Sequence, residues 1–133
     1  MNLTDLQIAA ASCCLCDLHK NRKKPVFAKG ENCFGLMIVG MVPGPEENEK
    51  GIPFVGSAGK LLDDLLSKLD ISTKDVYITN TVKCALKPGI ALKEQWIEAC
   101  LPFLIAQITI IKPKVILSLG ADATNTLLGL PLM

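Results

Sequence analysis

The chain has 133 residues, of which 50% are apolar and only 5% aromatic, and its formal net charge is +1. This length favours one domain, which we expect to span residues 1–133, with a core built mainly from aliphatic side chains. The near-neutral charge excludes a protein that is basic overall. Any contact with nucleic acid must therefore come from a local basic patch.

Two features of the sequence predict a cytoplasmic protein with no membrane partner. We find no apolar run that we interpret as long enough to cross a bilayer. The short apolar stretch 6–11 follows an acidic residue and no basic one, which makes a poor signal peptide. Because disulfides are rare in the cytoplasm, the six cysteines indicate metal or redox chemistry.

The predicted elements alternate between helices and strands. Short apolar runs predict buried strands, and leucines at helical spacing predict helices. In chain order we predict a helix (3–12, capped by Asn2 or Thr4), an irregular segment (17–35), a strand (36–40), a glycine- and proline-rich loop (41–56), a helix (57–69), a strand (76–80), a loop (82–91), a helix (92–111), a strand (115–119) and a helix (121–128). This order predicts an α/β fold, a parallel sheet flanked by helices, whose ligands bind beyond the C-terminal strand ends.

Four cysteines form a candidate metal site. Cys13 and Cys16 make a CxxC pair whose thiolates can converge on one ion, and Cys84 and Cys100 supply two more distant ligands. Spacing alone leaves zinc, an iron–sulfur cluster and ordinary buried thiols open. Two further cysteines are interpreted as non-ligands (Cys14 and Cys33).

Two side chains near the predicted strand ends are suited to a nucleobase. Phe54 lies among prolines and glycines, which favours a displayed ring that can stack on a base over a core position. Asn80 ends the strand 76–80, where its carboxamide can both donate to and accept from a base edge, although a capping role is the alternative. Gly40 opens a glycine-rich turn that allows close approach of a ligand to the backbone.

A short basic cluster follows the CxxC pair. We interpret it either as a solvated loop or as a patch that contacts phosphates. Its members are Lys20, Arg22, Lys23 and Lys24.

The combined motifs cover almost the whole chain. They are Cys13-x-x-Cys16, Gly40-x-x-Pro43-Gly44-x-x-Glu47, Gly51-x-Pro53-Phe54-Val55-Gly56-x-Ala58-Gly59-x-Leu61-Leu62, Tyr77-Ile78-Thr79-Asn80-x-Val82-Lys83-Cys84, and Cys100. With them the chain resembles the family 4 uracil-DNA glycosylases, the iron–sulfur branch of their superfamily. The resemblance implies a three-layer α/β/α fold, a [4Fe–4S] cluster on the four cysteines, and hydrolysis of the N-glycosidic bond of uracil in DNA.

The resemblance also implies roles for individual residues. Phe54 would stack on the flipped base, and Asn80 would offer its NH2 to uracil O4 and its carbonyl to N3–H. Backbone amides around Met41 and Val42 would stabilise charge on uracil O2. Glu47 would either crowd the 5-position against thymine or order the attacking water, and the sequence does not decide between them.

Departures from the family pattern limit the expected activity. Met41 stands where the family usually has Glu, and Val42 offers no general base. The family has a later fourth strand and a His-Pro-Ser segment, whereas this chain ends at Met133, and its one histidine, His19, matches nothing catalytic.

We therefore expect a C-terminally truncated domain with weak or no glycosylase activity. The alternatives are a non-catalytic module that binds nucleic acid or uracil, and a metal-stabilised interaction domain. A missing fourth strand would expose the edge of the strand 115–119, so we expect reduced stability or self-association there.

Overall fold

A computed structural model describes residues 2–11 and 22–130 of the chain. Every helix and strand expected from the sequence is present, with ends close to the predicted ones. Asn2 caps the first helix by accepting a hydrogen bond from the Asp5 N–H at 2.9 Å. In chain order the elements are α1 (Leu3–Ala11), β1 (Ala28–Lys29), β2 (Leu36–Gly40), α2 (Pro45–Lys50), α3 (Ser57–Lys68), the 3-10 turn η2 (Thr73–Asp75), β3 (Tyr77–Asn80), α4 (Glu94–Ile111), β4 (Val115–Ser118) and α5 (Ala121–Leu128).

The sheet has the strand order β1-β3-β2-β4. The central strand β2 pairs in parallel with both β3 and β4, which confirms the predicted three-stranded parallel sheet. The structure adds β1, which pairs antiparallel with β3 inside the segment predicted to be irregular. A strand of two residues is too short for alternation of apolar and polar residues to reveal it.

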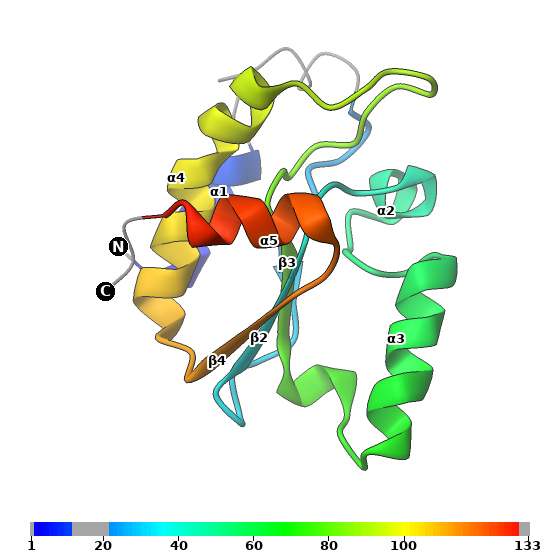
Figure 1. Ribbon diagram of the computed structural model, residues 1–133, viewed down its shortest axis with the longest axis vertical. Helices are drawn as coiled ribbons and strands as arrows, with labels where there is room; N and C mark the ends of the chain where they lie inside the picture. The colour runs from blue at the N-terminus through cyan, green and yellow to red at the C-terminus, as the bar shows by residue number, and fades with distance from the viewer. Residues whose placement is uncertain (1, 12–21, 131–133) are drawn as a thin grey trace.

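Helices cover both faces of the sheet, which confirms the three-layer α/β/α architecture (Figure 1). Successive residues of a strand point to opposite faces. On one face, Ile38 and Ile78 pack with Leu62 and Leu66 of α3. On the other face, Met37, Val39 and Tyr77 pack with Leu104 of α4, and partly buried residues of α1 and α5 join this cluster. Even-numbered residues of β2 and β3 therefore face α3.

The helix α2 interrupts the segment that we predicted to be a loop. Its sequence does carry the signals of a helix, because Pro45 occupies the first turn and Gly51 ends it in the left-handed conformation (φ 72°). The density of glycine and proline in residues 41–56 masked these signals. The helix brings Glu47 back toward the residues that follow it.

The long helix α4 bears on the expectation that no apolar run is long enough to cross a membrane. Its 18 residues have a mean hydropathy of 1.2, so by length and composition alone the helix could cross a membrane. In the fold, however, α4 packs on the sheet through Leu104 and through the buried amide of Gln107. Both observations suit a helix that covers the core of a sheet.

Candidate functional site

The C-terminal ends of β2 and β3 lie side by side. Gly40 and Asn80 are partners in the parallel register, and both belong to the face that α3 covers. A Cβ atom added at Gly40 would lie 2.5 Å from Asn80 Oδ1 and 2.6 Å from Phe54 Cζ. The missing side chain therefore leaves the space in which the carboxamide and the aromatic ring approach each other.

Phe54 has a strained backbone that directs its ring to this position. Its φ of 54° lies in the left-handed region, which costs a residue with a side chain roughly 1–2 kcal/mol. Its carbonyl oxygen accepts a hydrogen bond from Lys29 Nζ at 2.9 Å. The same oxygen lies over Gly59, where an added Cβ would come within 1.9 Å. The neighbours therefore fix the Phe54 peptide group as well as its ring.

The carboxylate of Glu47 organises the loop around the site. Its Oε1 accepts from the Gly44 N–H at 3.0 Å, and its Oε2 accepts from Val55 and Gly56 at 2.8 and 2.7 Å. Burial alone would raise the pKa of Glu47, but these N–H groups outweigh burial and hold the pKa below its ordinary value. Glu47 is thus an ionised clamp between the start and the end of the loop.

These side chains border a cavity of about 210 Å³. Asn80 is only 3% exposed as a residue. Lys83 donates to its backbone carbonyl, but no hydrogen bond joins its carboxamide to another described residue. Buried amides normally find partners, so this one is available to a ligand. The cavity is smaller than the roughly 300–1,000 Å³ pockets of drug-sized ligands, so it suits a small molecule. Its lining residues are Val42, Gly44, Glu47, Phe54, Ala58, Gly59 and Asn80.

Comparison with known proteins identifies the family. A family model described as the uracil DNA glycosylase superfamily matches residues 29–132. The chain belongs to this superfamily. The match begins at Lys29 and contains Glu47, Phe54 and Asn80, so the cavity lies within the matched region.

Curated members of the superfamily resemble the chain over most of its length. A type-4 uracil-DNA glycosylase of Pyrobaculum aerophilum is 45% identical over 98% of this chain and 66% of its own. A type-4 uracil-DNA glycosylase of Archaeoglobus fulgidus is 37% identical over 97% of this chain and 65% of its own length. A third, from Thermotoga maritima, is 45% identical over 85% of this chain and 59% of its own length. The chain thus spans just under two thirds, or less, of the length of these relatives.

The structure brings together some of the predicted base-binding residues of this superfamily member. Phe54 and Asn80 meet in the cavity, and Val42 lines it. Met41 does not line it; its carbonyl accepts from the Val82 N–H at 2.9 Å. The N–H groups of Met41 and Val42 donate to no other described residue, so they remain available as donors directly after β2.

Two of the four predicted metal ligands lie within the described residues. Cys84 and Cys100 are both 3% exposed and share one core cluster with Val82 and Trp96. Cys84 Sγ accepts a hydrogen bond from the Arg22 guanidinium at 3.0 Å. Cys13 and Cys16 lie outside the described residues, as does His19. Within the described part of the chain, no group of three or more potential ligands gathers.

The predicted basic cluster is partly engaged within the protein. Arg22 donates to Cys84 and to the Ala11 carbonyl, and Lys23 pairs with Glu49. Lys24 is exposed, and Lys20 lies outside the described residues. Arg22 therefore connects two parts of the fold through hydrogen bonds, and Lys23 is the described member that forms an ion pair.

Sequence reasoning missed a buried lysine behind the site. Lys83 Nζ donates to Thr79 Oγ1 and to Gln107 Oε1, both at 2.7 Å, and to the backbone carbonyl of Asn80. Full burial lowers the pKa of Lys83 to about 7, and the neighbouring Cys100 opposes that shift. Its position between Val82 and Cys84 in a buried segment was the available signal, because an isolated lysine there needs partners.

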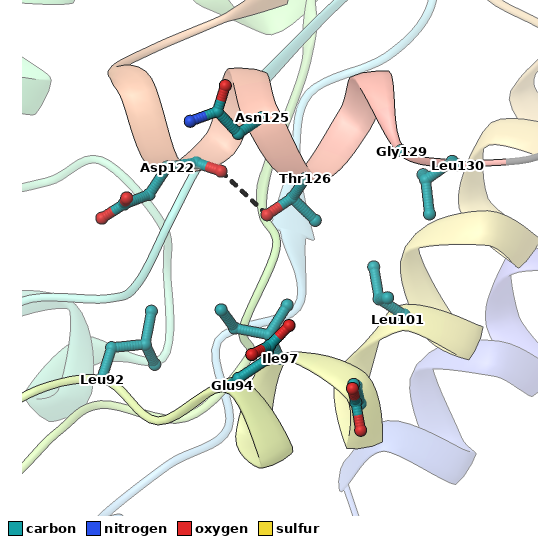
Figure 2. Close-up of a pocket in the computed structure, with 10 residues that line it drawn as sticks. Leu92, Glu94, Ile97, Leu101, Asp122, Asn125, Thr126, Gly129 and Leu130 are labelled. Carbon is teal, nitrogen blue, oxygen red and sulfur yellow. Dashed lines mark hydrogen bonds between the residues drawn. The ribbon is translucent and has the colours of Figure 1, made fainter.

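A larger cavity lies away from the residues described above. It has a volume of about 460 Å³ and lies between α4 and α5 (Figure 2). Three carboxylates border it, from Glu94, Glu98 and Asp122, and no aromatic ring does. These charges would repel a phosphate backbone, so the smaller cavity is the candidate base site.

Proposed function

We propose that this chain is a uracil-DNA glycosylase domain that reads uracil in DNA with Phe54 and Asn80. The observation that carries the proposal is the Asn80 carboxamide, which bonds to no other described residue and lies beside the Phe54 ring in a cavity of about 210 Å³. The names of the type-4 relatives support the same substrate. The biological role would be repair of DNA that contains uracil.

The carboxamide would supply the discrimination between bases. Its NH2 would donate to uracil O4, and its oxygen would accept from N3–H. Cytosine presents the opposite pattern, so it would leave buried groups unpaired at a cost of about 1–3 kcal/mol each. Stacking on Phe54 would return about 1–3 kcal/mol of the cost of flipping the base out of the helix.

The backbone after β2 would serve the bond-breaking step. As the glycosidic bond breaks, negative charge grows on uracil O2. The N–H groups of Met41 and Val42, which donate to no other described residue, would stabilise this charge. Val42 has no group that can take a proton, so it would position the base without acting as a general base.

A second function, binding of uracil without cleavage, is favoured by the state of Glu47. Its carboxylate oxygens already accept three backbone N–H groups, which reduces their capacity to order or deprotonate a water. Glu47 would then shape the cavity, and the described residues that line it include no other carboxylate that could activate a water. If the chain does cleave the bond, the reaction would depend on electrostatic stabilisation of the leaving uracil.

The cysteines would hold a [4Fe–4S] cluster that stabilises the fold. Two observations fit such a group: Cys84 and Cys100 come from different elements into one buried cluster, and an arginine donates to Cys84 Sγ, which favours the thiolate. Cys13 and Cys16 would complete the set, with zinc as the alternative metal. Hydrolysis needs no electron, so the cluster would be structural.

The remaining assignments follow from this function. DNA that contains uracil would be the partner, and the chain would form one domain over residues 1–133. The reduced thiols that a cluster requires would place the protein in the cytoplasm.

Incubation with single- and double-stranded DNA that contains uracil tests the proposal. Cleavage of abasic sites by alkali would report base release, and Phe54→Ala and Asn80→Ala should each reduce it by about tenfold or more. Selective binding without release would establish the second function. Equal affinity for DNA with and without uracil would refute both.

A further inference from the structure

We propose that Lys29 is a positioning residue that holds the Phe54 ring in place for base recognition. The proposal rests on the proposed function, because the orientation of the ring matters only if the ring stacks on a base. Lys29 ends β1, the short antiparallel strand beside β3, and belongs to none of the motifs that marked the site. Its half-buried side chain reaches from this sheet edge to the loop that carries Phe54.

The conformation of Phe54 is one that needs support from its neighbours. A φ of 54° is unfavourable for a residue with a bulky side chain. Such conformations persist only where the surrounding structure over-determines them, and they concentrate at functional sites. Here the conformation places Cζ of the ring next to Gly40 and the carboxamide of Asn80.

Two charged side chains hold the peptide group that follows Phe54 from opposite ends. Lys29 Nζ donates to the Phe54 carbonyl oxygen at 2.9 Å. The Val55 N–H of the same peptide group donates to Glu47 Oε2 at 2.8 Å. Because a peptide group is planar and rigid, fixing both of its ends fixes its plane. That plane in turn sets the two backbone angles beside it, ψ of Phe54 and φ of Val55.

Steric contact alone does not replace the lysine. Gly59 packs against the Phe54 carbonyl oxygen, so it limits how far the peptide group can move inward. It offers no hydrogen bond that would stop the carbonyl from rotating outward. Without Lys29 we expect the peptide group to rotate part of the time, so that ψ of Phe54 varies and the ring is held less firmly in the cavity.

The alternative for a lysine near a DNA site is a contact with phosphate, and binding measurements separate the two roles. The 133-residue chain would be titrated with single-stranded DNA carrying one 2′-fluorinated deoxyuridine, which resists hydrolysis, and with the same strand carrying thymidine. We expect Lys29→Met to weaken binding of the uracil strand by about tenfold, the effect of one charge-assisted hydrogen bond. Binding of the thymidine strand should stay unchanged.

Matched variants complete the experiment. Lys29→Arg keeps a cationic donor and should recover most of the affinity. Lys74→Met removes a nearby exposed charge whose side chain donates no hydrogen bond to the loop within the described part of the chain, and it should behave like the wild type. In a Phe54→Ala background, Lys29→Met should have no further effect, because it acts through the ring.

Hydrogen exchange gives a readout that does not depend on DNA. The Val55 and Gly56 amides should exchange faster in Lys29→Met than in the wild type, with other regions unchanged. Unchanged exchange, equal losses for both strands, or additive losses in the Phe54→Ala background would each overturn the proposal. If the wild type itself shows no preference for uracil, the proposed function fails, and exchange alone decides whether Lys29 holds the loop.

Discussion

At the scale of single residues, the site depends on positions where one atom decides the geometry. Gly40 has ordinary strand backbone, so its value lies in the space that it leaves between Asn80 and Phe54. Glu47 has the opposite character, because its side chain accepts three backbone N–H groups. Gly40 contributes through the side chain that it lacks, and Glu47 contributes through its hydrogen bonds. A substitution at each residue tests its contribution separately.

Gly40→Ala should weaken base recognition while the fold survives. The new Cβ would lie 2.5 Å from Asn80 Oδ1 and 2.6 Å from Phe54 Cζ, so one of these groups must move. We expect binding of DNA that contains uracil to weaken by about tenfold or more, as for loss of a hydrogen bond and a stacking contact. The control is Gly129→Ala, whose Cβ would make only ordinary contacts at 3.6 Å. Equal behaviour of the two variants would contradict the site.

Glu47 should make stability depend on pH in the acid range. Its folded-state pKa lies below the ordinary value of 4.5, so the stabilisation is complete well above that pH. It is lost as the pH falls through the folded-state pKa. We expect Glu47→Gln to cost about 1–3 kcal/mol at pH 7 and to flatten the acid limb of the stability curve.

Urea unfolding at a series of pH values measures this effect. Glu49→Gln is the matched control, because Glu49 is exposed and pairs with Lys23 on the surface. It should change stability little. A wild-type curve that stays parallel to that of Glu47→Gln down to acid pH would show that the carboxylate is not the clamp.

At the scale of elements, β4 is the outermost strand of the described sheet. It pairs with β2 on one side, and Val115 and Leu117 are 58% and 43% exposed. An apolar edge strand of this kind tends to pair with other strands. The self-association expected from the sequence therefore remains a prediction, now with named exposed residues.

Leu117→Lys should suppress such association. A charge on an edge strand opposes pairing with a second copy, so the concentration dependence of the scattering mass should fall. Leu128→Lys removes a more exposed leucine, 80% exposed on α5, without touching the edge. If both variants reduce association equally, nonspecific hydrophobic contact and not strand pairing is responsible. A wild type that stays monomeric at all concentrations would contradict the prediction outright.

At the scale of the whole molecule, buried polar contacts connect the sheet to α4. Lys83, Thr79 and Gln107 share hydrogen bonds, and Gln107 also donates to the Tyr77 hydroxyl at 3.0 Å. Burial raises the pKa of Tyr77 to about 12, so this hydroxyl stays protonated. Lys83 follows the strand that carries Asn80 and precedes Cys84. Asn80 of the base site and Cys84 thus lie on one buried segment of the chain.

Removal of the proposed cluster should destabilise the molecule as a whole. Anaerobically purified wild type is expected to contain iron and sulfide, and Cys100→Ser should lose both and melt at a lower temperature. Cys33→Ser is the control, because Cys33 is exposed and was not interpreted as a ligand. Equal metal content in the wild type and Cys100→Ser would exclude Cys100 as a ligand.

The sequence by itself determined the parallel α/β framework and the motif residues Phe54 and Asn80. Continuous apolar runs and helical leucine spacing are local signals, so they can be interpreted without knowing what packs against them. The helix α2 also had local signals, Pro45 and Gly51, which the surrounding glycines and prolines obscured.

Only the tertiary structure decided how the site is held together. The hydrogen bonds of Glu47, the reach of Lys29 to Phe54 and the burial of Lys83 join residues whose spacing along the chain shows no periodicity. The sequence left two roles open for Glu47, and the structure adds a third, because its carboxylate already accepts three N–H groups. Such contacts depend on the direction of side chains after the sheet and helices have packed, and no local pattern encodes that direction.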